Sequence, residues 1–184
     1  MNLGFWNSLS PRGKRILTIA LVLVAITIVT GLSMLTPMTH KQAVDTTNEI
    51  NQTVQTLRGI GTEDLFTYIF GNNFFITMLM FIPFVGPLIG FIGFYNSGVG
   101  LESEAIALGY PPGLYFAAEF LVPIIWLEFI AYSTAIAASI WLSARILQGG
   151  FRHEIVNTAK FIAVCAVILL VSAAIETALI VALQ

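Results

Sequence analysis

Long apolar runs separated by shorter polar stretches dominate the chain, and each run is about the length that a membrane-spanning helix needs. A hydrocarbon core of ~30 Å takes about 20 helical residues. The first and last runs stand alone, whereas the apolar stretch between residues 65 and 147 is too long for one crossing and suits three. The five predicted spans lie at about 16–35, 65–84, 87–108, 123–146 and 161–183. The pattern predicts an all-α, polytopic membrane helix bundle in a single membrane domain, residues 1–184.

Basic residues set the orientation of these spans. Positively charged segments beside membrane helices stay in the cytoplasm. The residues concerned flank the first span and the connection between the fourth and fifth spans: Arg12, Lys14, Arg15, Arg145, Arg152 and Lys160. An odd number of crossings must then separate the outer segment after the first span from the loop at 144–160. Three crossings give an inner N-terminus and an outer C-terminus; a re-entrant pair made by the second and third spans is the alternative.

Two shorter helices are predicted on the outer side. In the polar segment 40–61, Ile50, Val54 and Leu57 recur at helical spacing, which predicts an amphipathic helix on the membrane or on a partner. Thr62 is predicted to cap the second span. The stretch before Pro123 reads as a short interfacial helix.

Composition agrees with a membrane protein. The chain is 57% hydrophobic with a mean hydropathy of +0.88, and 10% of its residues are charged, against about 25% in soluble domains. The single Cys165 rules out a disulfide framework, and His40 and His153 lie in polar segments where solvation explains them. We expect a multi-pass protein of the cell membrane, with no cofactor, no metal and no nucleic-acid partner. The motifs HExxH and GxSxG and a P-loop are absent, so we expect no enzyme.

The carboxylate of Glu128 stands out, because a charged group at the centre of a membrane helix costs ~2.5–3.5 kcal/mol and usually has a use. Other polar residues are expected at similar depth: Asn72, Asn73, Asn96 and Glu176. We predict that Glu128 points into the bundle and is hydrogen-bonded to an asparagine. Three interpretations remain open, namely hydrogen bonds that hold helices together, a path for cations or protons, and an anchor for a partner's transmembrane helix. An outer rim of solvated acids is expected at Glu102, Glu104 and Glu119.

Small residues mark two surfaces for close helix packing. In lipid, such residues let two helix backbones approach each other. They lie on the third and fourth spans: Gly86, Gly90, Gly93, Ser97, Ala131, Ala135 and Ser139. Packing within one chain and contact in a homo-oligomer or with a membrane protein partner are both compatible with this pattern.

Three stretches carry a family likeness: "IFGNNFFITMLMFIPFVG", "FYNSGVGLESEA" and "LVPIIWLEFIAYSTAIAASIWL". Together they resemble the stage II sporulation protein M family of small polytopic membrane proteins. The resemblance implies five spans and, in spore-forming bacteria, a scaffold that recruits wall-degrading partners. This chain departs from the family pattern: Ile124 and Ile125 stand where the family has His-Gly, and Ser97 replaces a glycine.

These observations lead to one expected function and one alternative. We expect a non-enzymatic integral membrane scaffold or assembly factor that contacts the lipid bilayer and partner proteins. The alternative is a channel or transporter subunit that passes cations or protons along an acidic cluster in the outer half of the membrane.

Overall fold

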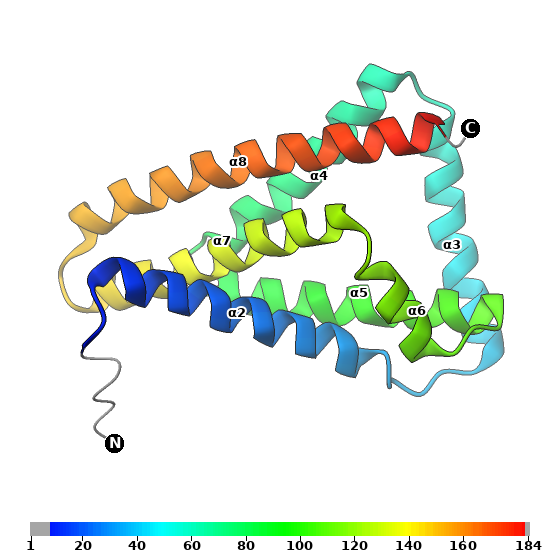
Figure 1. Cartoon of the computed structure of the whole chain (residues 1–184), viewed down its shortest axis with the longest axis horizontal. Helices are drawn as coiled ribbons and strands as arrows, with labels where there is room; N and C mark the ends of the chain where they lie inside the picture. Colours follow the sequence, from blue (N-terminus) through cyan, green and yellow to red (C-terminus); the bar gives the residue numbers. More distant parts are fainter. Residues whose placement is uncertain (1–7, 183–184) are drawn as a thin grey trace.

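The computed structural model describes residues 8–182, and this range is all-α, with seven helices and no strand. The helices are α2 (Pro11–Ser33), α3 (His40–Arg58), α4 (Thr62–Met80), α5 (Gly86–Leu108), α6 (Pro112–Glu119), α7 (Pro123–Leu147) and α8 (Phe151–Ala182). Three of them, α2, α7 and α8, are long and apolar enough to cross a membrane. Figure 1 shows α2, α5, α7 and α8 running along the bundle, α4 crossing it obliquely, and α3 lying across one end.

The start of α2 is set by its sequence. Ser10 has an extended backbone, and its hydroxyl accepts a hydrogen bond from the Gly13 N–H at 3.1 Å. Pro11 occupies the first helical position, where a missing N–H costs nothing. Ser10 is therefore the N-cap of α2.

Helix α7 is the centre of the bundle and contacts α2, α4, α5 and α8. All nine residues from 131 to 139 are buried, on every side of the helix. The sequence predicted one stripe of small residues on this helix. The structure corrects that picture: Ala131, Ala135 and Ser139 are fully buried, but so are their neighbours Ser133 and Ile136. A narrow helix is needed where four others converge on it.

The turn between α4 and α5 is short and tied to α7. The Ser139 hydroxyl donates to the carbonyl oxygen of Ile82 at 2.6 Å, and the Phe84 N–H donates to the hydroxyl oxygen of Ser143 at 2.7 Å. A Cβ on Gly86 would overlap the Met80 carbonyl oxygen, so only glycine lets the chain reverse here. Helices α4 and α5 are therefore joined by a tight turn.

Helix α3, which lies across one end of the bundle, is present as predicted. Thr39 and Gln42 form a reciprocal capping box at its start. Its buried face turns towards α5 and includes Ala43 and Thr47, while Val54, one of the three predicted apolar positions, is 38% exposed. The amphipathic helix therefore packs on its own bundle. The short helix α6 also forms where an interfacial helix was expected.

Two local predictions are wrong. The cap of α4 is Gly61, which makes no side-chain bond, and Thr62 is the first helical residue. Helix α8 begins at Phe151, ten residues before the predicted span, so the loop expected at 144–160 is a short turn in which Gly149 has a φ of 74°. The early start has a reason, because the first turn of α8 carries a charged partner for α2.

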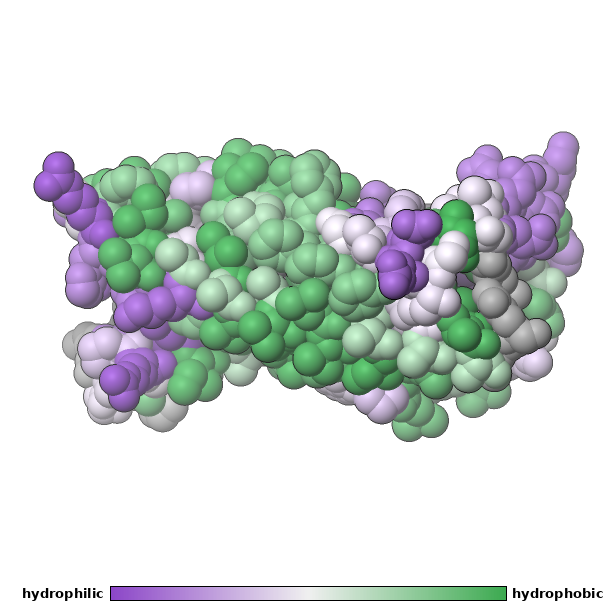
Figure 2. All heavy atoms as spheres, turned by 90° about the horizontal axis from the view of Figure 1, so that it is seen from above, coloured by the Kyte–Doolittle hydropathy of each residue, from purple (hydrophilic) through white to green (hydrophobic). Residues whose placement is uncertain are grey.

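The surface matches a membrane protein in its distribution of polarity. Figure 2 shows hydrophilic residues gathered towards the two ends of the long axis and a broad hydrophobic band between them. Large apolar side chains are exposed along the long helices, among them Leu21, Ile92 and Val167. Exposed apolar surface of this extent needs lipid or protein to cover it.

Candidate functional site

Two adjoining cavities, of about 500 Å³ and 300 Å³, lie between α5 and α7. They share four lining residues, Gly93, Ser97, Glu128 and Phe129, so they lie directly beside each other and are treated together. Helix α4 borders the deeper part of this space, and α3 and Phe120, the C-cap of α6, border its other end. We call this space the polar groove. Its hydrogen-bonding side chains are Thr30, Asn73, Asn96, Ser97, Glu104, Glu128 and Tyr132.

Glu128 lies at the centre of the polar groove. Pro123 begins α7, and Glu128 follows in its second turn. The Asn73 side-chain amide of α4 donates a hydrogen bond to Glu128 Oε1 at 2.8 Å. The predicted bond between Glu128 and an asparagine is therefore present. An amide N–H satisfies one lone pair of a carboxylate that has about four acceptor sites.

The other predicted members of this cluster are placed differently. Asn96 lines the polar groove and its side chain is exposed. Asn72 is exposed on α4, lies outside both cavities, and has only a long 3.5 Å contact with Asn73. Glu176 lines a separate cavity of about 120 Å³ between α3, α4 and α8, although it interacts electrostatically with Glu128. The structure thus brings together Glu128, Asn73 and Asn96 in one groove.

Two acids of the predicted rim meet at the outer end of the polar groove. Glu104 lines it and accepts a hydrogen bond from the Tyr115 hydroxyl at 2.8 Å. Burial raises the pKa of Glu119 above its ordinary value, and the charge of Glu104 raises it further. Burial also raises the pKa of Tyr115, as does its bond to Glu104. Glu104, Tyr115 and Glu119 therefore lie close enough to influence one another between α5 and α6.

The third acid of that rim, Glu102, does not lie at a solvated edge. Its side chain is 7% exposed, and its oxygen Oε2 has no hydrogen-bond partner. A backbone hydrogen bond with Thr36 is its one stabilising contact. The prediction was wrong because Glu102 lies on a different face of α5 from Glu104, towards the chain that links α2 to α3.

The small residues of α5 divide into a filled part and an open part. A Cβ on Gly90 would overlap the side chain of Ile136, and one on Gly86 would approach the Ser139 hydroxyl. A Cβ on Gly93 would meet nothing within 4 Å, and Ser97 is exposed. The half of this face near the turn between α4 and α5 is thus occupied by α7, and the half with Gly93 and Ser97 forms a wall of the polar groove.

Sequence reasoning missed a second close contact on α5. A Cβ on Gly98 would overlap the Ser33 hydroxyl and the Thr30 carbonyl oxygen, so α2 and α5 touch backbone to backbone there. Gly98 lies in the run "NSGVG", and nothing in its spacing says which glycine faces which helix.

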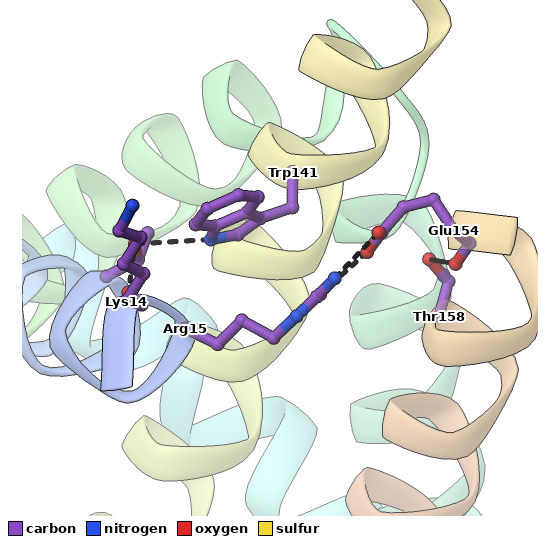
Figure 3. A network of polar contacts seen from close by, with 6 residues as sticks. Lys14, Arg15, Trp141, Glu154 and Thr158 are labelled. Carbon is purple, nitrogen blue, oxygen red and sulfur yellow. Dashed lines mark hydrogen bonds and ion pairs between the residues drawn. The ribbon is translucent and has the colours of Figure 1, made fainter. Parts of the chain in front are cut away.

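Sequence reasoning also missed an ion pair at the opposite end, shown in Figure 3. Both guanidinium nitrogens Nη1 and Nη2 of Arg15 donate to the two carboxylate oxygens of Glu154, each at 2.6 Å. The guanidinium also lies 5.2 Å from the centre of the Trp141 ring. We call Arg15, Trp141 and Glu154 the inner clip; it joins α2, α7 and α8. One acid in an otherwise basic segment was the available signal.

The polar groove does not continue towards the inner clip. At its deep end it is lined by Met80 and Tyr132, both of which are buried. One turn further along α7, Ile136 is fully buried against Gly90. Around Arg15 and Trp141 the packing leaves no volume for a water molecule.

Neither known proteins nor metal-binding patterns identify the site. Comparisons with family profiles, with curated proteins and with solved structures give no match. Within residues 8–182, no three His, Cys, Asp or Glu side chains are grouped so as to hold a metal ion. The arrangement of the polar groove is what remains to be interpreted.

Proposed function

We propose that this chain is a five-span integral membrane protein that acts as a non-enzymatic scaffold and binds a partner protein through the polar groove. One observation carries the proposal: the polar groove ends at Met80 and Tyr132 within the bundle. A path for ions or protons needs polar contacts across the whole hydrocarbon core. A groove with a closed floor serves instead to bind something.

Five crossings agree with the lengths and directions of the helices. Besides the three apolar helices, α4 and α5 have 19 and 23 residues. At 1.5 Å per residue these helices are about 28 Å and 34 Å long, enough to cross. Their turn lies beside Ser143, about 30 Å from Pro123 along α7. This favours a full crossing over a re-entrant pair.

The resemblance to the stage II sporulation protein M family supports the same class of function. That likeness includes Asn73 and Glu128, which the structure joins by a hydrogen bond. Ile124 and Ile125, which replace the family's His-Gly, give this chain no imidazole in that position.

The topology can be tested by cysteine labelling. Cys165 is fully buried, so the natural chain has a low background. A cysteine at the exposed position of Glu49 should react with an impermeant maleimide from outside intact cells, and one at Gly149 should react only after the membrane is opened. Labelling of the Gly149→Cys variant in intact cells would overturn the orientation.

The second candidate, a channel or transporter subunit, is favoured by the acids Glu104 and Glu128 in one groove. The scaffold and the channel can be distinguished by measuring ion leak from liposomes that contain the purified protein and hold a proton or potassium gradient. A scaffold gives the same leak as vesicles without protein. A leak that requires Glu128, and that is lost in Glu128→Gln with normal folding, would refute the scaffold and establish the alternative.

A further inference from the structure

The polar groove holds two acidic side chains and no basic one among the described residues. Glu104 and Glu128 both line its larger cavity, and within the part of the chain that the structure describes no Lys, Arg or His lines either cavity. At the other end of the bundle, Arg15 is engaged by Glu154. The hydrogen bonds to these acids come from neutral donors, the Tyr115 hydroxyl for Glu104 and the Asn73 amide for Glu128, and the Ser172 hydroxyl also lies close enough to Glu128 to stabilise its carboxylate.

Glu128 lies too deep for bulk water to stabilise it as it would a surface residue. It follows the first residue of α7 by five positions, so it lies about 7.5 Å further along the helix axis. Ionisable groups at such depth pair with one another or mark a functional site. The cavity beside Glu128 has room for a group that supplies the missing charge.

The wall beside Glu128 is shaped for a helix. Gly93 and Ser97 are four residues apart on α5, and nothing lies within 4 Å of a Cβ built on Gly93. Small residues at this spacing let a second helix approach the backbone closely. The same kind of surface, at Gly90, is already filled by Ile136 of α7. The part of the α5 surface at Gly93 and Ser97 is therefore unoccupied, whereas the part at Gly90 packs against α7.

We infer that the polar groove binds the transmembrane helix of a partner protein that carries one Lys or Arg in the outer half of the membrane. Its cation lies against Glu128, with Glu104 further out, and its small-residue contact is at Gly93 and Ser97. This inference rests on the proposed scaffold function and specifies the partner's chemistry.

A lipid ammonium group fits these observations less well. Headgroups lie at the interface, above the depth of Glu128. The outer end of the groove is also narrow: Phe120, the C-cap of α6, lines it, and Ile50 of α3 lies 3.9 Å from the position of a Cβ on Gly100. A transmembrane helix of a partner can instead approach Glu128 laterally, from the side of the groove on which Asn96 and Ser97 are exposed.

The probe is a pair of synthetic transmembrane peptides in lipid nanodiscs that hold the full chain. Both are alternating Leu and Ala; one carries a single Lys about 7 Å below the outer interface, and the other has Leu at that position. Binding is followed by energy transfer between a dye on the peptide and a dye on Gly149→Cys. We expect the Lys peptide to bind the natural sequence at least ~10-fold more tightly than the Leu peptide.

Three variants of the chain locate the site. Glu128→Gln should abolish the preference for Lys while keeping the fold. Gly93→Leu should fill the groove and weaken both peptides. Gly71→Leu is the matched control, because Gly71 also has nothing within 4 Å of a Cβ but lines neither cavity of the groove; it should bind like the natural chain.

The outcomes are separable. Equal binding of the two peptides to the natural chain, or unchanged Lys-peptide binding in Gly93→Leu, overturns the inference. Displacement of the Lys peptide by phosphatidylethanolamine in the nanodisc, or by an unlabelled second copy of the chain, also overturns it and identifies a lipid or a homo-oligomer as the occupant. If the Lys peptide does not bind selectively and the liposomes show no leak, the inference about the partner is wrong but the proposed scaffold function is kept. A proton or cation leak that depends on Glu128 refutes the scaffold function itself.

Discussion

The inner clip and the polar groove solve the same physical problem in opposite ways. Each places a glutamate within a mainly apolar helix bundle. Glu154, at 2% exposure, receives a bidentate guanidinium and an aromatic neighbour, and its surroundings are closed. Glu128 receives one amide, and a cavity is left open beside it. The first carboxylate is fully paired by its own chain, while the second is held in position with acceptor capacity unused.

The comparison teaches how to separate structural from functional charge in a membrane bundle. Breaking a buried ion pair by removing one partner is strongly destabilising, because the other charge remains. Glu128 has no ion-pair partner in the described structure, so its replacement leaves no unpaired charge behind. We therefore expect stability to depend on the inner clip and binding to depend on the polar groove.

The largest effect is expected at Arg15. Arg15→Ala leaves the carboxylate of Glu154 buried without its cation, and should lower the free energy of unfolding by about 3 kcal/mol. Unfolding in detergent, followed by circular dichroism, measures this. Arg12→Ala, at an exposed position on the same turn, is the control and should change little. Equal stability of the two variants would mean that the inner clip does not hold the bundle.

The next effect sharpens the contrast between filled and open glycine positions. Gly98→Ala should cost about 1–3 kcal/mol, because the added methyl overlaps Ser33 and Thr30. Gly93→Ala, with open space beside it, should be neutral within about 0.5 kcal/mol. Thermal unfolding of both variants in one detergent tests the pair. If both are neutral, α2 and α5 are less tightly packed than the structure has them.

A smaller effect is expected at Glu128. Glu128→Leu leaves the Asn73 amide without its acceptor, and should cost about 1–2 kcal/mol. Glu128→Gln retains an oxygen for that bond and should cost less than 1 kcal/mol. The same unfolding assay ranks them. A loss in Glu128→Gln as large as that of Arg15→Ala would show that the groove is structural and erase the comparison.

The smallest effect concerns Glu119 and pH. Because its folded-state pKa is raised, the protonated form favours the folded state, and that stability is lost as the pH rises through its pKa. Glu119→Gln removes the ionisation, so stability should fall less between pH 4 and pH 8 than in the natural chain. Melting temperatures across that range are the measurement. An unchanged pH dependence would place Glu119 in contact with water.

Much of the fold was readable from hydrophobic run lengths and turn residues. Three predicted spans correspond to apolar helices, and the amphipathic helix predicted in segment 40–61 is present as α3. The start of α8 was misplaced, because ten polar and apolar residues before residue 161 look like a loop unless one knows that Glu154 meets Arg15. A contact between residues 139 positions apart has no local signal.

The residues of the candidate site could be predicted from the sequence only in part. Glu128 and Asn73 stood out because polar groups are rare in such surroundings, and depth alone suggested that they meet. The expected depth of a residue in the membrane does not predict that Glu176 faces another cavity or that Glu102 is buried. Both outcomes depend on how each helix is rotated about its own axis. The sequence also gave no means of deciding which half of the α5 glycine surface α7 would fill.

The inner clip also has a consequence for the order of events during synthesis. Its two charged members are 139 positions apart along the chain. At translation rates of about 5–20 residues per second, Arg15 is made roughly 7–30 s before Glu154. During that interval α2 lacks the contact that fixes it to α8, and α7 lacks part of its lipid-facing cover. The contact between α2 and α8 at this point therefore cannot form until the beginning of α8 is made, and a chain cut short before Glu154 leaves the Arg15 guanidinium without its carboxylate partner.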